Sequence, residues 1–195
     1  YDNATVHPNG MGAVESRGWM FVNSGGGTSA NLSEFDVYRF PLSGYAASNL
    51  PNTPAPEVLY SDDNTVPERD SHGTVATQRG RYLWVGDRAR NVAEVFDTAS
   101  GAHVNTVDLI SPESDDPTPD YADTSPSGNR IFFALRGPNP LTGDAHVATG
   151  STPGLGVVQV NPGGKGGFLQ AVAPISNVDS TGVERGDPHG IRVRV

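Results

Sequence analysis

Histidine and aspartate recur in one short pattern at two distant places in the sequence. Residues 68–73 read Glu-Arg-Asp-Ser-His-Gly, and residues 184–190 read Glu-Arg-Gly-Asp-Pro-His-Gly. Both copies would open the first strand of a repeated unit, so we expect His72 and His189 to face one central cavity. Imidazole nitrogens arranged around a cavity can hold a divalent transition metal.

A carboxylate occupies the corresponding position in another unit. His72 lies as far before the turn glycine Gly80 as Asp120 lies before Gly128. In the first unit the counterpart is His7, with a longer spacing to its turn. The pattern therefore predicts a transition-metal site with the ligands His72, His189, Asp120 and His7. A structural interpretation also stands, in which Asp-x-His-Gly is a turn whose histidine bonds a neighbouring unit.

The element that would position these residues is clearest between residues 70 and 109. After the segment 70–77, short apolar or alternating runs follow at 82–85, 92–96 and 104–109, separated by turns rich in Gly, Asn, Asp and Ser. Such runs are typical of strands. Four short strands joined by tight turns, in a unit of about 40 residues, form one blade of a β-propeller.

The same order of strands and turns recurs along the chain, which predicts an all-β propeller of four-stranded antiparallel blades. We expect blade 1 at residues 5–62, blade 2 at 68–110, blade 3 at 115–176 and the first strand of a further blade at 184–195. A β-sandwich has short strands too, but it does not explain their return in the same order. Open end blades lack neighbours, so we expect the remainder of the propeller as a missing segment, a second chain or a symmetry mate.

The second unit resembles the YVTN or lactonase-like β-propeller family. The resemblance rests on Tyr-Leu-Trp-Val-Gly at 82–86, Val-Phe-Asp-Thr-Ala-Ser-Gly at 95–101 and Val-Asn-Thr-Val at 104–107. It implies the propeller architecture. As an activity it implies hydrolysis of lactones or related esters, in which a bound cation polarises the carbonyl and activates water.

Three functions stay open on the sequence, which does not decide whether the chain is an enzyme. The first is a binding or assembly scaffold that uses the blade faces and the long loops 24–33 and 137–154 for a protein partner or a small molecule. In that case the Glu-Arg pairs at 68–69 and 184–185 serve as ion pairs between blades. The second is the lactonase-like hydrolase, and the third is a copper-dependent redox protein, since histidine suits copper.

The composition of the chain limits the kinds of binding partner and the cellular compartment that we expect. The net charge of −9 comes from 13 Lys and Arg against 22 Asp and Glu, and an acidic surface repels nucleic acid. No apolar stretch approaches the roughly 20 residues that a membrane span needs, and the absence of cysteine excludes disulfides and thiolate metal sites. A first residue other than Met and sequons at Asn3 and Asn31 favour a secreted or periplasmic protein.

Overall fold

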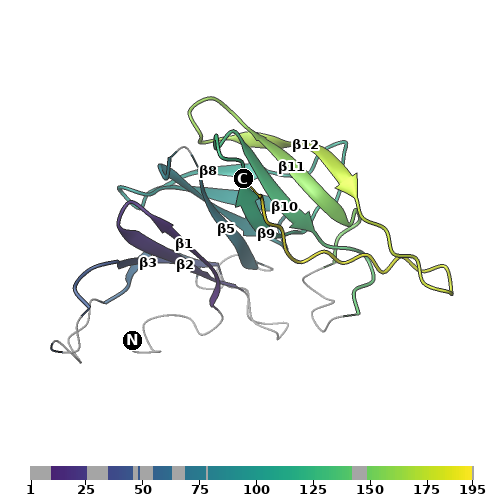
Figure 1. The fold of residues 1–195 in the computed structure, drawn as a ribbon, viewed down its shortest axis with the longest axis horizontal. Helices are drawn as coiled ribbons and strands as arrows, with labels where there is room; N and C mark the ends of the chain where they lie inside the picture. The colour runs from purple at the N-terminus through teal and green to yellow at the C-terminus, as the bar shows by residue number, and fades with distance from the viewer. Residues whose placement is uncertain are drawn as a thin grey trace.

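The chain folds into three antiparallel sheets that follow one another along an open arc (Figure 1). The computed structural model describes residues 10–25, 35–45, 48, 55–62, 69–77, 79–141 and 149–194. Within this part of the chain every sheet has four strands in sequential order. The predicted fold class, an all-β propeller of four-stranded blades, is confirmed. No helix among these residues has the length and apolarity needed to cross a bilayer.

Each sheet is one blade. Sheet 1 comprises β1 (Gly10–Ser16), β2 (Trp19–Ser24), β3 (Asp36–Pro41) and β4 (Glu57–Ser61). Sheet 2 comprises β5 (Ser71–Thr77), β6 (Tyr82–Asp87), β7 (Val92–Asp97) and β8 (His103–Asp108). Sheet 3 comprises β9 (Pro119–Thr124), β10 (Arg130–Leu135), β11 (Gly154–Val160) and β12 (Gly167–Pro174).

The hairpin turns explain the recurring glycines. Arg17 and Gly18 connect β1 to β2, and both have a positive φ (52° and 83°), as two-residue hairpin turns of the primed type require. Gly80 and Gly128 adopt the same left-handed backbone (φ 77° and 67°) between the first two strands of sheets 2 and 3. Glycine takes up this conformation without a steric penalty at Cβ. The glycines that align the units in the sequence therefore mark equivalent turns.

Sheet 2 is buried on both faces because it lies between the other two sheets. Along β6 every residue is buried. Leu83 and Val85 pack with residues of sheet 1, whereas Tyr82 and Trp84 pack with residues of sheet 3. The Trp84 indole N–H also donates to the backbone oxygen of Gly164 (3.0 Å), in the turn between β11 and β12. A strand covered on both faces reads as a continuous apolar run, which is what the sequence of β6 shows.

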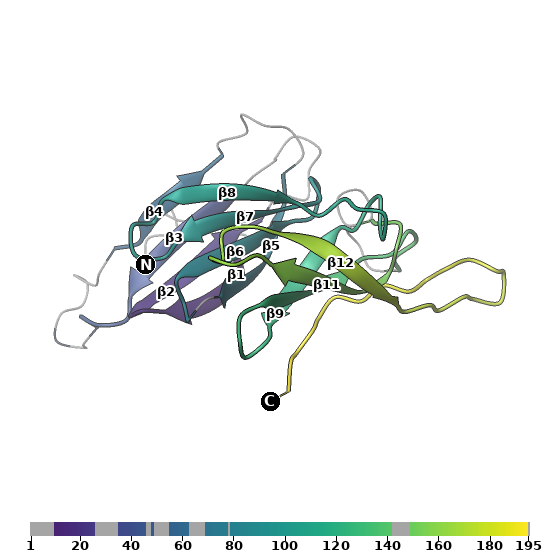
Figure 2. The same cartoon turned by 90° about the horizontal axis from the view of Figure 1, so that it is seen from above.

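The first strands of the sheets, β1, β5 and β9, lie side by side at the inner edge of the arc (Figure 2). A Cβ on Gly73 in β5 would lie 2.1 Å from the backbone oxygen of Asp120 in β9, so this approach requires glycine. These strands and residues 190–192 line a groove of about 370 Å³. His72, Asp120 and His189 are not among the residues that line this groove, so a shared cavity for the two histidines stays a prediction.

The chain after sheet 3 first leaves the body and then returns to it. Residues 175–186 form a projecting loop, drawn in yellow in Figures 1 and 2. Residues 187–194 then run along β9, where the Tyr121 N–H donates to the backbone oxygen of His189 (3.3 Å). The described residues of 184–194 belong to none of the three sheets. The strand expected there, like the blade bounds 5–62, 68–110 and 115–176, stays a prediction.

Candidate functional site at the inner strands

Two arginines follow the second strand of sheets 2 and 3 at equivalent positions. The Arg88 backbone N–H donates to the oxygen of Asp70 (3.0 Å), and that of Arg136 donates to the oxygen of Thr118 (3.2 Å). Asp70 therefore corresponds to Thr118, and two residues further on His72 corresponds to Asp120. The structure thus places these two residues at the equivalent positions that their spacing to the turn glycines gives them.

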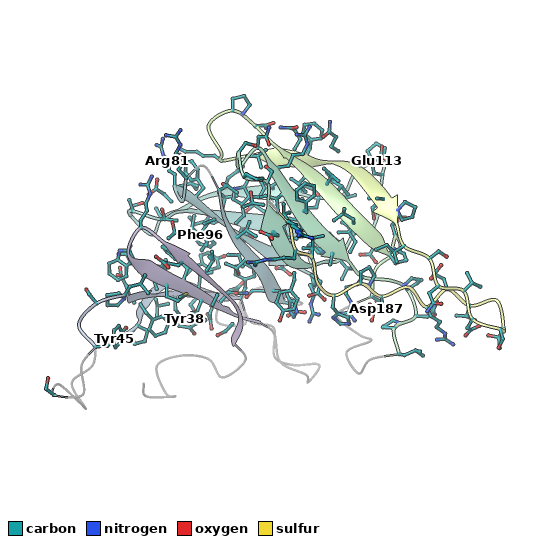
Figure 3. The ribbon with its side chains drawn as sticks, viewed as in Figure 1. Tyr38, Tyr45, Arg81, Phe96, Glu113 and Asp187 are labelled. Carbon is teal, nitrogen blue, oxygen red and sulfur yellow. The ribbon has the colours of Figure 1, made fainter. Side chains whose placement is uncertain are left out.

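The two arginines link acidic residues of successive inner strands. Arg88 Nε donates to Asp70 Oδ2 (2.6 Å), and its Nη1 donates to Asp120 Oδ2 (3.5 Å). Arg136 Nη1 donates to the same Asp120 oxygen (3.0 Å), and its Nη2 donates to Asp187 Oδ2 (3.0 Å). We call these five residues, Asp70, Arg88, Asp120, Arg136 and Asp187, the Asp–Arg chain. Asp187 lies where the C-terminal segment passes sheet 3 (Figure 3).

Histidines approach the middle of this chain from both sides. His72 Nε2 lies 3.0 Å from Asp120 Oδ1, and His189 Nδ1 lies 3.3 Å from Asp120 Oδ2. His189 Nε2 also lies 3.2 Å from Asp187 Oδ2. The His72 and Asp120 side chains are buried, whereas the His189 side chain is 44% exposed. Three of the four predicted site residues thus lie together, and the fourth, His7, lies outside the described residues.

The charges around Asp120 keep its carboxylate ionised. Burial acts to raise the pKa of Asp120, but the neighbouring His72 side chain and the guanidinium groups of Arg88 and Arg136 outweigh it, so the pKa lies below its ordinary value. Burial acts to lower the pKa of Arg136, and its bonds to Asp187 and Asp120 raise it instead. The middle of the Asp–Arg chain is therefore charged at neutral pH.

Two buried atoms at this site lack a hydrogen-bond partner in the described part of the chain, His72 Nδ1 and Asp120 Oδ1. Oδ1 has His72 Nε2 at ion-pair distance, but no donor is aligned with it. These atoms could act as metal ligands or as proton acceptors. Across the described residues, however, no three His, Asp or Glu side chains are arranged to hold a metal ion. The four-residue metal site, which includes His7, stays a prediction.

A second buried cluster, centred on Arg69 of the first Glu-Arg pair, joins sheets 1 and 2. Arg69 donates to Asp87 (2.8 Å), Glu94 (2.6 Å) and Asp62 (3.2 Å). Burial acts to lower the pKa of Arg69, but the charges and hydrogen bonds of Asp87 and Glu94 raise it above its ordinary value. Burial raises the pKa of Asp87 more than Arg69 lowers it. Arg69 thus forms ion pairs between blades, as expected, although with partners other than Glu68, which lies outside the described residues.

The Glu-Arg pair at 184–185 has a different role from the one expected. Arg185 Nε donates to Asp179 Oδ2 (2.9 Å), and Glu184 accepts from the backbone of Asn177 and Gly186. Arg185 Nη1 also donates to the Asn139 oxygen (3.4 Å), so these bonds fix the loop 175–186 internally and to the β10–β11 connection of the same sheet, and they do not join two sheets. The two Glu-Arg pairs therefore have the same residues but make different contacts.

The arginines of the Asp–Arg chain were not among the predicted site residues. A signal existed, because Arg88 lies as far behind Gly80 as Arg136 lies behind Gly128. Only the folded chain shows that Arg88 reaches Asp120 on β9 and that Arg136 reaches Asp187 in the C-terminal segment.

Comparison with known proteins supports the fold and gives no closer family. No family model matches the sequence, and no curated protein matches it. A candidate 6-phosphogluconolactonase from Bacteroides uniformis aligns with a TM-score of 0.54 at 15% identity, over 89% of this chain and 45% of that one. A second, from Bacteroides fragilis, gives 0.52 at 10% identity, over 89% and 45%. A hypothetical selenium-binding protein from Sulfolobus tokodaii gives 0.57 at 10% identity, over 87% and 42%.

These findings define the class of the protein. It is a β-propeller protein whose structural neighbours include lactonase-like propellers. At these identities the likeness shows the fold alone, and the YVTN repeat family stays a prediction. The chain spans less than half the length of the proteins it matches.

Proposed function

We propose that this chain is part of a β-propeller that serves as a binding or assembly scaffold outside the cytoplasm. One observation carries the proposal: the Asp–Arg chain links the residue before β5, the inner strand β9 and the C-terminal segment through ion pairs, with Arg136 bonded to Asp120 and Asp187. The residues with the greatest potential for chemistry are thereby engaged in holding strands together. In a scaffold, the blade faces and loops supply the binding surfaces, and no catalytic group is needed.

The position of Asp120 favours the scaffold over a metal enzyme. Two guanidinium groups lie within 3.5 Å of its Oδ2. Like charges at such distances repel strongly in a buried site, so Arg88 and Arg136 disfavour a cation on this carboxylate. The structural interpretation of Asp-x-His-Gly, a histidine bonded to a neighbouring blade, agrees with the contact of His72 with Asp120.

A metal-dependent enzyme, lactonase-like or copper-dependent, is the second candidate. It is favoured by the two buried unpartnered atoms, His72 Nδ1 and Asp120 Oδ1, beside the partly exposed His189. The predicted ligand set of His72, Asp120, His189 and His7 would hold the metal, which in a hydrolase would polarise the substrate carbonyl and activate water.

Elemental analysis of the purified protein separates the two functions. The scaffold predicts no stoichiometric zinc, copper or manganese in the wild-type protein, before or after dialysis against each metal. A stoichiometric metal that is lost in His72→Ala and retained in His103→Ala would refute the scaffold and support the enzyme. His103 is a suitable control because it bonds Glu94, away from the Asp–Arg chain.

The extracytoplasmic location rests on the two sequons at Asn3 and Asn31. Fractionation of source cells, with an antibody against the chain, tests it. Recovery of the protein in the cytoplasmic fraction alone would contradict this part of the proposal.

A further inference from the structure

The connections between strands bring one end of the three sheets together. In each sheet the turn between the first two strands and the connection between the last two lie at the same end, which we call the turn end. Residues of different sheets touch there. Ser16 Oγ donates to the oxygen of Gly80 (2.7 Å), and Asn105 Nδ2 donates to the oxygen of Lys165 (2.7 Å). The turns of the three sheets therefore form one continuous surface.

The two ends of the sheets carry opposite charges, although the chain as a whole has a net charge of −9. Exposed acids such as Asp108, Glu113 and Asp115 lie at the end opposite to the turn end. Figure 3 shows Arg81 and Glu113 on opposite sides of the ribbon. The cations of the turn end come from all three sheets: Arg17, Arg39, Arg79, Arg81, Arg130 and Lys165.

Carboxylates at the turn end do not cancel these cations. Two of them are already paired, Glu57 with Arg39 (2.7 Å) and Asp123 with Arg192 (3.8 Å). In the described part of the chain Glu15 and Asp97 remain at this end, against the five cations other than Arg39. The turn end is therefore positively charged.

The acids of the opposite end lie too far away to neutralise this surface. A strand of six residues, such as β6, spans about 20 Å, at roughly 3.3 Å per residue. At physiological ionic strength, interactions between exposed charges are largely screened beyond about 8 Å. An anionic surface that approaches the turn end therefore meets its cations, and not the net charge of the whole chain.

Two of the arginines have a backbone conformation that disfavours them. Arg17 and Arg79 have φ angles of 52° and 58°, and each directly precedes a glycine with a positive φ. Side chains other than Asn and Asp seldom adopt this left-handed conformation. In the β6–β7 turn, at the opposite end of sheet 2, the left-handed residue is Asn91 (φ 58°). Arginine at both turns costs conformational free energy, which indicates a role for its charge.

Arg81 and Lys165 bring charges of sheets 2 and 3 to the same aromatic ring. The Arg81 Cζ atom lies 5.2 Å from the centroid of the Tyr82 ring, and Lys165 Nζ lies 6.0 Å from it. Tyr82 is buried, whereas both cationic residues are exposed. The buried ring thus supports two cations from neighbouring sheets at the surface of the protein.

An apolar and an aromatic side chain lie near the Arg17 turn. The Leu42 N–H donates to the oxygen of Gly18 (3.0 Å), so the β3–β4 connection begins against this turn. Leu42 and Tyr45 are each 42% exposed, and Figure 3 shows Tyr45 at the margin of the molecule. Exposed leucine and tyrosine near cations are typical of surfaces that lie in the interface of a bilayer.

We propose that the turn end binds the surface of an anionic lipid bilayer. The exposed cations contact headgroup phosphates, and Leu42 and Tyr45 enter the boundary between headgroups and acyl chains. A flat partner fits this end, because the five cations lie at turns and strand ends and none of them lines the groove at the inner strands. This inference rests on the scaffold function and names the surface to which the scaffold attaches.

Co-sedimentation of the full chain with lipid vesicles tests the proposal. One set of vesicles is an equimolar mixture of phosphatidylglycerol and phosphatidylcholine, and the other is phosphatidylcholine alone. We expect binding to the mixed vesicles to be about tenfold or more tighter, because each cation near an anionic surface favours binding about fivefold. Binding should weaken as salt is added, because salt screens these charges.

Matched variants locate the contact. Arg79→Asn should weaken binding to the mixed vesicles about fivefold, and Arg17→Asn with Arg79→Asn about 25-fold. Arg90→Asn, which removes an exposed cation at the opposite end, should leave binding unchanged. Asparagine adopts the left-handed conformation more readily than arginine, so the variants at 17 and 79 should unfold at or above the wild-type midpoint. Their loss of binding is thereby separated from failure to fold.

A second pair of variants tests the apolar contribution. Leu42→Ser should lower the binding that persists in high salt, because that binding depends on the apolar side chain. Leu141→Ser is the control, since Leu141 is 80% exposed in the β10–β11 connection at the opposite end.

Three results would overturn the inference. In the first, the wild-type chain fails to sediment with the mixed vesicles in low salt. In the second, Arg79→Asn and Arg90→Asn weaken binding equally. In the third, heparin binds the chain through Arg79 while the vesicles do not, which identifies an acidic polysaccharide as the partner. None of them bears on the metal analysis of His72→Ala, so failure here can be distinguished from failure of the scaffold function.

Discussion

Arg136 Nη1 donates to Asp120 Oδ2 at 3.0 Å, and both side chains are almost fully buried. The same arginine also bonds Asp187, so one guanidinium holds the inner strand β9 to the C-terminal segment. A buried ion pair is weak support for stability by itself, but removing one partner leaves the other charge buried without compensation. The Asp–Arg chain therefore makes each of its members sensitive to substitution.

Arg136→Met tests this sensitivity. The substitution keeps much of the side-chain volume and leaves Asp120 and Asp187 without their shared cation. We expect a loss of about 3–5 kcal/mol in the free energy of unfolding, measured by urea denaturation. Arg185→Met, which breaks a partly exposed pair with Asp179, should have a much smaller effect. Equal, small losses in the two variants would contradict the role given to the Asp–Arg chain.

The pH dependence of stability follows from Asp120. Its pKa is lower in the folded protein than in the unfolded chain, where it is about 3.9. The folded state therefore gains stability from this group above the unfolded pKa, and loses it as the pH falls through the lower folded pKa.

We accordingly expect the wild-type free energy of unfolding to fall as the pH drops below about 4, and the fall to be shallower in Asp120→Asn. Urea denaturation at a series of pH values measures both slopes. Glu113→Gln, an exposed residue outside the chain of ion pairs, should keep the wild-type slope. A slope in Asp120→Asn as steep as in the wild-type protein would show that the lowered pKa lies elsewhere.

Gly73→Ala tests the close approach of β5 and β9. An added Cβ would lie 2.1 Å from the Asp120 backbone oxygen, which neither strand can relieve without moving. We expect a loss of about 3 kcal/mol or more in thermal or urea unfolding. The matched control is Gly190→Ala in the second copy of the motif, where a Cβ meets nothing within 4 Å. A comparable loss in both variants would contradict the packing of the inner strands.

Trp84→Phe tests the contact between sheet 2 and the β11–β12 turn. Phenylalanine keeps an aromatic ring in the core but removes the donor to Gly164, so the buried carbonyl loses its partner. We expect a loss of about 1–3 kcal/mol. Trp19→Phe, which keeps a ring beneath the Arg39 guanidinium, should cost less. If the two variants unfold alike, the hydrogen bond of Trp84 contributes little.

The strands and turns of the fold follow largely from residues that are neighbours in the sequence. The apolar run of β6, the alternation in β7 and the turn glycines Gly80 and Gly128 are effects of neighbouring residues, and they predict strands, turns and their order. The repeated spacing also aligned His72 with Asp120, which the backbone bonds of Arg88 and Arg136 bear out. These features depend on backbone conformation and on periodicity, so they can be predicted from a single sequence.

The contacts between blades do not follow from the repeated sequence motif. The repeated motif places His72 in a buried contact with Asp120 but leaves His189 partly exposed. Its Glu-Arg pair joins sheets 1 and 2 at Arg69, whereas Arg185 bonds Asp179 in its own loop and Asn139 in the β10–β11 connection of sheet 3. Partners such as Arg69 and Glu94, or Arg136 and Asp187, come from different strands or sheets.

The sequence by itself thus determined the blades, their turns and the recurrence of Asp-x-His-Gly. Only the tertiary structure decided that Arg88 and Arg136 both bond Asp120 and so link the neighbourhood of β5 and β9 to the C-terminal segment. The physical reason is that short-range periodicity specifies each strand, whereas the approach of side chains across blades depends on how twisted sheets pack. That packing brings together groups whose separation along the chain follows no period.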